Sequence, residues 1–206
     1  MNGVDLMGVG DVSRETFARL EAFSALVLKW TEKINLIAKG TKDDIWHRHI
    51  LDSAQVWTGA PKAWTHWVDI GSGGGFPGIV VACIAVEKRP GTRFTLIESD
   101  QRKATFLRTA ARELGLPVTV IANRIEAVEP QRADVLSARA LASLDLLLNF
   151  AEIHLSPTGT ALFQKGRGAD QEISEAKSKW TFDFTCLPSI TDPEANLICI
   201  RDIARV

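Results

Sequence analysis

An acidic residue followed by regularly spaced glycines is the part of the sequence that points most directly to chemistry. Asp69 is followed by Gly71, Gly73 and Gly75, in the segment Asp-Ile-Gly-Ser-Gly-Gly-Gly-Phe-Pro-Gly. Glycine lets the backbone turn tightly and approach a ligand closely, where a Cβ atom would block it. Glu98 lies about twenty residues further on, where a carboxylate can accept hydrogen bonds from both ribose hydroxyls of a cofactor. The pattern predicts a binding turn for a nucleotide-type cofactor, with contacts from Gly71, Gly73 and Glu98.

Two cofactors fit this turn. The spacing Gly73-x-Gly75-x-x-Gly78 matches the dinucleotide pattern of NAD-binding proteins. Asp69 favours S-adenosylmethionine (SAM), because a helix N-terminus already attracts anions and an added carboxylate suits a cationic amino group better than a pyrophosphate. On this reading Asp69 contacts the amino group of SAM. We prefer SAM, and an NAD-dependent dehydrogenase stays open as the alternative.

The elements that must position this turn alternate along the chain. Apolar runs predict strands at 67–70, 93–97, 118–121, 134–137, 159–164, 182–187 and 197–201. Helical spacing covers 13–38, 43–57, 79–87, 102–114, 142–154 and 170–179. Alternating strands and helices predict an α/β fold with a mostly parallel sheet covered on both faces. The last two runs have no helix between them, so we expect one reversed strand at an edge. Class I SAM-dependent methyltransferases, which are Rossmann-like, close their sheets in this way, and this analogy favours SAM.

Domain boundaries follow from changes in composition. Residues 1–12 are glycine-rich without periodicity and predict a loose N-terminal arm. Residues 13–60 predict a helical extension, and 61–206 the methyltransferase domain, which forms one structural unit with the extension.

Composition excludes several classes of protein. The 206 residues carry 24 basic and 25 acidic side chains, so the net charge of −1 excludes a polybasic protein. Three cysteines without a CxxC pair indicate a reducing compartment and no metal site. Because neither a signal peptide nor an apolar run of about 20 residues is present, we expect a cytoplasmic monomer without membrane contact.

The absence of two sequence motifs reduces the range of possible methyl acceptors. Enzymes that methylate exocyclic amines of bases usually carry (N/D/S)PP(Y/F) after the fourth strand, where this chain reads Leu-Ser-Ala-Arg-Ala over 136–140. Those that methylate pyrimidine carbon need a cysteine nucleophile, and no cysteine lies near that strand. Acceptors with a free lone pair or an ordinary hydroxyl remain. Guanine N7 is one of them, and it requires no general base because it has no proton to lose.

Several motifs spread over most of the chain occur together in one known family. They are Lys29-Trp30-x-x-x-Ile34-Asn35-Leu36, His-Arg-His-Ile-Leu-Asp-Ser over 47–53, the glycine segment 69–78, Ser137-Ala138-Arg139-Ala140 with Ala142-Ser143-Leu144, and Lys165-Gly166. In this combination, from about residue 13 to 201, the chain resembles the RsmG family, formerly called glucose-inhibited division protein B. The resemblance implies SAM-dependent methylation of guanine N7 in the decoding-region loop of 16S rRNA.

The resemblance also implies cofactor contacts at Gly71, Phe76, Ile125, Glu126 and Arg139. The segment that contains two of them, Asn-Arg-Ile-Glu over 123–126, departs from the family's Ser-Arg-x-Glu pattern at its first position. In the glycine segment, a glycine at 74 stands where proline is common, and phenylalanine at 76 where leucine is common.

Basic residues near strand ends are the candidates for substrate contact. Arg139 follows the fourth predicted strand, so we expect it to contact RNA or to orient the cofactor. Lys165 and Arg167 follow the fifth strand, where phosphate contact is a natural role. Arg124 is a further RNA-binding candidate, and Arg139 and Lys165 are the only candidates for a catalytic role.

Three questions stay open at this point. His49 and Asp52 share a helix face, and we favour a structural pair because N7 transfer needs no base. The substrate is naked 16S rRNA, the small ribosomal subunit or an assembly intermediate. A non-catalytic rRNA-binding or assembly factor with the same fold is a further alternative.

Overall fold

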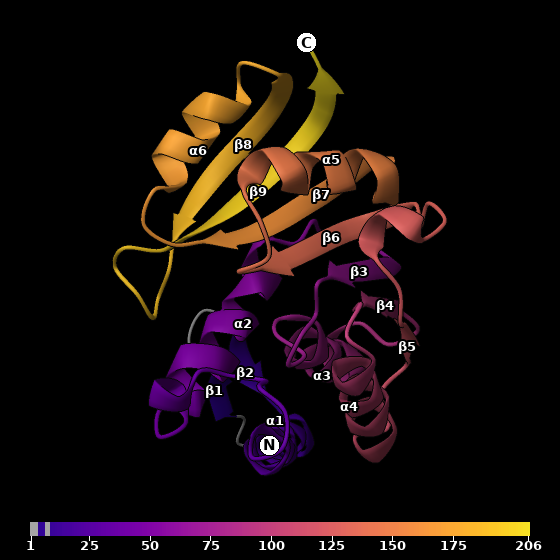
Figure 1. Ribbon diagram of the computed structural model, residues 1–206. Coiled ribbons are helices and arrows are strands. Elements are labelled where there is room, and N and C mark those ends of the chain that lie inside the picture. The colour runs from indigo at the N-terminus through magenta and orange to yellow at the C-terminus, as the bar shows by residue number, and fades with distance from the viewer. Residues whose placement is uncertain (1–3, 7–8) are drawn as a thin grey trace.

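A seven-stranded sheet forms the centre of the protein in the computed structural model, which describes residues 4–6 and 9–206. Its strands follow the order β5-β4-β3-β6-β7-β9-β8 (Figure 1). They are β3 (His66–Ile70), β4 (Arg93–Ile97), β5 (Val118–Ile121), β6 (Ala133–Arg139), β7 (Leu155–Lys165), β8 (Trp180–Pro188) and β9 (Asn196–Arg205). The predicted strands are all present, and all of them except β4 and β5 extend beyond the predicted limits.

Strand direction confirms the predicted fold class. The strands from β5 to β7 are parallel to their neighbours, whereas β9 is antiparallel to both β7 and β8. The reversed strand is therefore β9, one position inside the edge, and β8 forms the edge itself. Because parallel strands end at the same side of the sheet, the carboxyl ends of β3, β4, β5, β6 and β7 share one rim.

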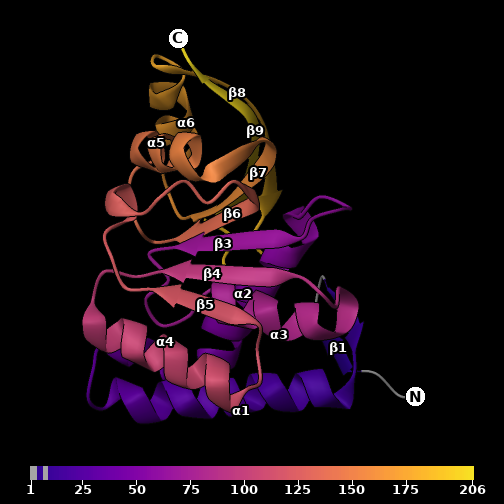
Figure 2. The same ribbon diagram turned by 90° about the vertical axis from the view of Figure 1, so that its right-hand side faces the viewer.

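Helices cover both faces of the sheet. They are α1 (Arg14–Thr31), α3 (Gly78–Lys88), α4 (Gln101–Glu113), α5 (Leu144–His154) and α6 (Ala169–Ala176). Side chains of α1, α3 and α4 belong to one buried apolar cluster, and those of α5 and α6 to a second. Figure 2 shows α1 running below α4 and α3. In the described helices, no segment combines the length and hydropathy that crossing a membrane requires.

The alternation of side chains along the strands explains the two clusters. In β3, Trp67 packs in the cluster of α1, α3 and α4, and its neighbour Val68 packs in the cluster of α5 and α6. Both side chains are fully buried. Burial on both faces is typical of a parallel strand, and it fixes which residues of β3 face which helix.

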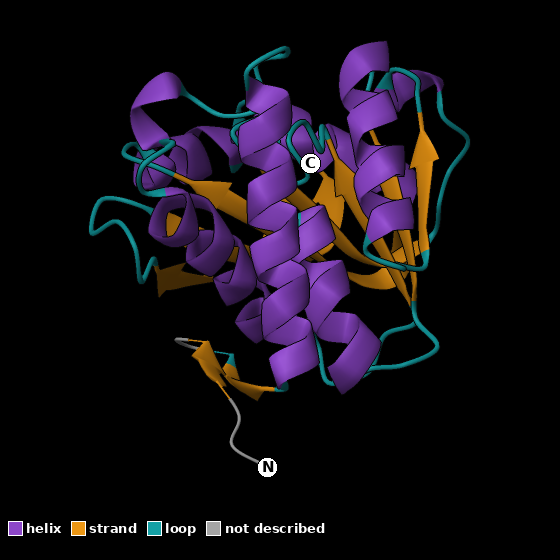
Figure 3. Ribbon diagram, turned by 90° about the horizontal axis from the view of Figure 1, so that it is seen from below, coloured by secondary structure: helices purple, strands orange, loops and turns teal. Residues whose placement is uncertain are grey.

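The N-terminal segment differs from the predicted loose arm. Val4–Leu6 (β1) and Gly10–Val12 (β2) pair as an antiparallel hairpin, visible as a small separate pair of strands in Figure 3. Leu6 and Val12 are 1% exposed and join the core. The prediction is wrong for this described part because two apolar side chains, too few for a periodic pattern, are enough to anchor the hairpin.

The first long helix begins where the sequence indicates. Ser13 is the N-cap of α1, and its hydroxyl oxygen accepts from the backbone N–H of Thr16 at 3.1 Å. The helix ends at Thr31, earlier than the predicted limit at 38, and turns with one 3₁₀-helix (Lys39–Thr41, η1) occupy the residues up to 44.

A helical segment of mixed geometry follows these turns. A π-helix (Trp46–Leu51, η2) passes into a short α-helix (Asp52–Ala54, α2) and then a 3₁₀-helix (Gln55–Gly59, η3). The sequence predicts one helix over 43–57, and periodicity alone does not reveal the change in hydrogen bonding. π-Helical turns are frequent at functional sites, and this one carries His49 to the carboxyl rim of the sheet.

Candidate active site

The glycine segment forms a tight turn between β3 and α3. Gly71, Gly73 and Gly75 have φ values of +63°, +51° and +86°, which side-chain-bearing residues rarely adopt. A Cβ atom on Gly71 would lie 2.5 Å from Cδ1 of Leu141. A Cβ atom on Gly73 would lie 3.7 Å from its nearest neighbour, a backbone oxygen of the same turn. The turn, which we call the glycine loop (residues 71–78), therefore presents an open backbone surface at Gly73.

Glu98 holds this loop from the end of β4. Its Oε2 accepts from the backbone N–H of Gly73 and its Oε1 from that of Asp100, both at 2.8 Å. The side chain is 7% exposed. Each carboxylate oxygen has a further acceptor position, so the contact of Glu98 with ribose hydroxyls stays a prediction.

Asp69 lies beneath the loop and not in it. The residue is fully buried, and Ser137 Oγ donates to its Oδ1 at 2.5 Å. Trp67 Nε1 in turn donates to Ser137 Oγ at 2.8 Å. Burial raises the pKa of the Asp69 carboxyl to about 7. The expected contact of Asp69 with the amino group of SAM is wrong for this structure, because the carboxyl is packed under Gly78 at the start of α3.

The other residues that the resemblance assigns to the cofactor lie along the same rim. A 3₁₀ turn after β5 (Ile125–Ala127, η4) carries Ile125, which is 9% exposed, and Glu126, which is exposed and paired with Arg124 at 2.7 Å. The Ile125 carbonyl accepts from His154 Nε2 at 3.1 Å. Since β5 and β3 flank β4, this turn and the glycine loop lie at one side of the sheet.

Arg139 ends β6 and connects the loop to the helical segment. Its Nε pairs with Asp52 Oδ2 at 3.1 Å, and its Nη2 donates to the carbonyl of Arg48 at 2.8 Å. Its Nη1 donates to Nδ1 of His49 at 3.0 Å, and the guanidinium carbon lies 5.9 Å from the centre of the Phe76 ring. The side chain is 21% exposed. Arg139 therefore bridges the glycine loop and η2.

His49 is fixed in one state by these contacts. Because Nδ1 accepts from Arg139, the ring proton is on Nε2, which lies 2.8 Å from Thr41 Oγ1. Burial and the charges of Arg139 and Arg48 lower the pKa of His49 to about 4. The ring lies 5.0 Å from the ring of Phe76. At neutral pH, His49 is therefore a neutral residue that orients Arg139. In the described contacts His49 and Asp52 do not form the direct pair expected from the sequence, but each contacts Arg139.

The ring of Phe76 is packed inward. It is 7% exposed and lies 5.2 Å from the ring of Phe23 on α1. A ligand at the glycine loop would therefore meet the backbone of Phe76 before its ring.

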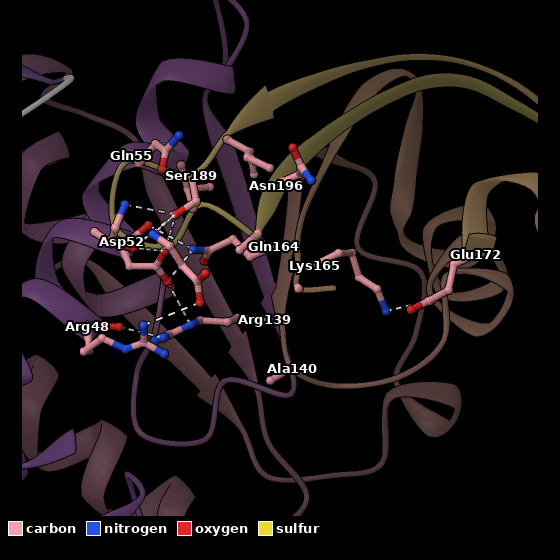
Figure 4. A pocket seen from close by; sticks show the side chains of 16 residues that line it. Arg48, Asp52, Gln55, Arg139, Ala140, Gln164, Lys165, Glu172, Ser189 and Asn196 are labelled. Atoms are coloured by element: carbon pink, nitrogen blue, oxygen red, sulfur yellow. Dashed lines mark hydrogen bonds and ion pairs between the residues drawn. The ribbon is translucent and has the colours of Figure 1, made fainter. Parts of the chain in front are cut away.

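A cavity of about 230 Å³ opens beside Arg139 (Figure 4), and none of its lining residues belongs to the glycine loop. Asp52 forms one wall. Gln164 at the end of β7 donates to its Oδ2 at 2.8 Å, and Thr191, in the turn between β8 and β9, donates to its Oδ1 at 2.9 Å. We call this space the Arg139 pocket.

Lys165 and Glu172 form another wall of the Arg139 pocket. Lys165 Nζ lies 2.8 Å from Glu172 Oε2 and donates to the carbonyl of Ala142 at 2.8 Å. Arg167, by contrast, is 80% exposed and pairs with Glu194 outside this wall. The structure thus brings Arg139 and Lys165 to one pocket and leaves Arg124 and Arg167 on the surface.

Sequence reasoning missed several pocket residues. Gln164, Glu172 and the turn 189–196 line the Arg139 pocket, and none was singled out. Glu172 sits on a helix with no distinctive motif, so only the spatial approach of α6 to β7 identifies it. His49 and Asp52 were found from their spacing, although their link to Arg139 was not.

Comparison with known proteins gives the same assignment as the motifs. The family model described as GidB, rRNA small subunit methyltransferase G, matches residues 16–198. A ribosomal RNA small subunit methyltransferase G from Ruegeria sp. (strain TM1040) is 53% identical over 196 residues, covering 95% of both chains. The protein of the same name from Parvibaculum lavamentivorans is 45% identical, covering 94% of this chain and 86% of its own.

Solved structures support the fold. A SAM-dependent methyltransferase from Aquifex aeolicus is 10% identical with a TM-score of 0.59, covering 86% of this chain and 97% of its own. TYW2 of M. jannaschii, solved in complex with AdoMet, is 14% identical with a TM-score of 0.57, covering 85% and 78%. The fold is that of the class I SAM-dependent methyltransferases, and the chain belongs to the rRNA small subunit methyltransferase G family.

Proposed function

We propose that this methyltransferase transfers the methyl group of SAM to N7 of a guanine in the decoding-region loop of 16S rRNA. The observation that carries the proposal is the position of Arg139, whose guanidinium lies between the glycine loop and the Arg139 pocket. A donor at the loop and an acceptor in the pocket would meet at this residue.

The glycine loop fits the cofactor. Gly73 offers open backbone surface, and Glu98 places a carboxylate directly behind it. Gly71, Gly73, Phe76 and Glu98 would hold the cofactor, with Ile125, Glu126 and Arg139 as the further expected contacts. When bound, SAM supplies an electrophilic methyl group on a sulfonium.

The residues around Arg139 suit an acceptor that needs no deprotonation. His49 Nδ1 already accepts from Arg139, and Asp69 is sealed in the core. Asp52 and Glu172, two carboxylates that line the pocket, are paired with Arg139 and Lys165. Guanine N7 has a free lone pair, so the protein has only to orient the base and exclude water. Ion pairs and hydrogen bonds hold Arg139 and Asp52 in place for that purpose.

The basic candidates divide by exposure. Arg124 and Arg167 have side chains 75% and 80% exposed, which suits contact with RNA phosphates. Lys165 and Arg139 are 12% and 21% exposed and face the pocket. We assign the first pair to RNA docking and the second to the target nucleotide, in a reaction placed in the cytoplasm.

Mapping of N7-methylguanine in 16S rRNA tests this proposal. Ribosomes from cells without the gene should lack one N7-methylguanine that is present in cells with it, and the purified protein with SAM should restore it. Naked rRNA, small subunits and assembly intermediates are compared as substrates. Identical methylation in both strains would overturn the assignment, and titration calorimetry that detects NAD but not SAM would favour the dehydrogenase.

A further inference from the structure

Lys165 and Glu172 form an ion pair at the Arg139 pocket, and each still has a hydrogen-bonding position without a partner in the described part of the chain. Lys165 Nζ contacts Glu172 Oε2 and the Ala142 carbonyl. An ammonium group has three N–H donors, so one remains. The side chain is 12% exposed and lines the pocket, where this donor is available.

Glu172 has capacity left on its other oxygen. Oε2 accepts from Lys165 and from the backbone N–H of Leu144 at 2.6 Å, at the start of α5. In the described part of the chain, Oε1 has no hydrogen-bond partner within the protein. The side chain is 29% exposed and lines the pocket. The pair therefore offers one N–H donor next to one carboxylate oxygen that has two free acceptor positions.

The donor and acceptor differ in their distance from Arg139. Lys165 ends β7, which pairs with β6 in the register Arg139 to Gln164. Glu172 lies on α6, and Figure 4 shows Lys165 on the side of the pair nearer Arg139.

This order matches the edge of a guanine. If N7 points to Arg139, O6 comes next and N1–H and the 2-amino group lie furthest away. O6 accepts hydrogen bonds, and N1–H and the 2-amino group donate them. Adenine presents an amino donor where guanine has O6, so it would set a donor against Lys165.

We propose that Lys165 and Glu172 read the target base, with Lys165 donating to O6 and Glu172 accepting from N1–H and the 2-amino group. This inference rests on the proposed function and adds the residues that select guanine. Reading a base through its Watson–Crick edge is how enzymes recognise a base extruded from its stack. It leaves N7 unbonded and free to react.

The test pairs a change in the protein with a change in the base. The mapped target guanosine of 16S rRNA is replaced by inosine, which lacks only the 2-amino group. Wild-type protein should show kcat/KM about fivefold to tenfold lower on inosine. In Glu172→Gln the amide oxygen can still accept from Leu144 and Lys165, so the cap of α5 is retained. This variant should lose about tenfold to a hundredfold on guanosine, and its ratio of guanosine to inosine activity should approach one.

Two variants control for fold and charge. Glu175→Gln removes an exposed charge from the same helix, at a side chain that pairs with Gln171, and should behave as wild type on both RNAs. Lys165→Met should lower activity on guanosine and inosine equally, because both carry O6.

The ratio separates base reading from a merely structural role. A wild-type ratio in Glu172→Gln would overturn the inference, since loss of the cap alone would lower both activities equally. If that variant does not fold, equal wild-type activity on guanosine and inosine would overturn it. Absence of methylation by wild-type protein on natural rRNA would instead contradict the proposed function.

Discussion

The two halves of the sheet's carboxyl rim are built by different means. At β3 and β4 the glycine loop is shaped by its backbone, with three left-handed glycines and a carboxylate that accepts only backbone N–H groups. At β6 and β7 the Arg139 pocket is shaped by long side chains that meet from η2, α6 and the turn 189–196. The first half contains a buried acid, and the second a neutral histidine beside an arginine.

This difference predicts how the structure of each half responds to a single substitution. A backbone-built site tolerates no added Cβ atom, because a side chain changes both the allowed φ and the space. A site built from side chains keeps its overall shape when one side-chain contact is lost. The remaining side chains then no longer hold a bound substrate in a fixed orientation. We therefore expect cofactor binding and turnover to respond separately to changes in the two halves.

The largest effect is expected for Gly71→Ala. The substitution places a side chain at φ +63° and within 2.5 Å of Leu141, so SAM binding and methylation should both be lost. Gly91→Ala is the matched control, because φ is +85° there with no atom within 4 Å. That control should lose about 1–2 kcal/mol of stability, and Gly71→Ala about 1–3 kcal/mol more. Calorimetry measures SAM binding by each variant, and urea unfolding measures its free energy of unfolding. Normal SAM binding by Gly71→Ala would remove the loop from the cofactor site.

The next effect is expected for Arg139→Ala. Loss of the guanidinium leaves His49 and Asp52 without the group that joins them, so kcat/KM should fall on the order of a hundredfold. The dissociation constant for SAM should rise less than in Gly71→Ala, because Arg139 is one of several expected cofactor contacts. Arg112→Ala is the control, because its exposed side chain lies in the last turn of α4 and does not line the pocket. If Arg139→Ala weakened SAM binding as strongly as Gly71→Ala, Arg139 would belong functionally to the half of the rim that contains the glycine loop.

The smallest effect concerns the dependence of stability on pH. His49 has a pKa of about 4 in the folded protein and 6.5 unfolded, so the unfolded state binds more protons between these values. Its contribution to stability therefore rises with pH in that window. Asp69 has a pKa of about 7 folded and 3.8 unfolded, so its contribution falls as pH rises from 3.8 to 7.

Urea unfolding at pH 4.5 and 6.5 separates the two groups. Relative to wild type, Asp69→Asn should make stability rise more steeply with pH, and His49→Asn should make it rise less or fall. Each slope changes by at most about 1.4 kcal/mol per pH unit, the limit for one proton. Slopes that change in the same direction in both variants would contradict the opposite environments of the two halves.

The half of the rim that contains the glycine loop could be predicted from the sequence, because residues close together in the chain determine its shape. Gly71, Gly73 and Gly75 follow a buried strand within a few residues, and their spacing alone implies the backbone shape. The alternation of strands and helices likewise predicts the parallel sheet. Where local reasoning failed was Asp69, since the sequence does not reveal that Ser137, 68 residues away, takes up its carboxyl oxygen.

The pocket half was only partly accessible to sequence reasoning because its contacts are long-range. Arg139 meets His49, 90 residues earlier in the chain, and Gln164 meets Asp52, 112 residues earlier. No periodicity records such pairs. Exposure was equally hidden, so Lys165 and Arg167 look alike in the sequence, although one lines a pocket and the other lies in solvent.

The position of β9 between β7 and β8 has a consequence for the order of assembly. During synthesis β8 emerges before the strand that must separate it from β7, so it has no correct neighbour until β9 is also made. The turn 189–196 belongs to the Arg139 pocket and joins these two strands. A nascent chain can thus complete its glycine loop while one wall of the Arg139 pocket is still missing, so this pocket is the last part of the carboxyl rim to be completed.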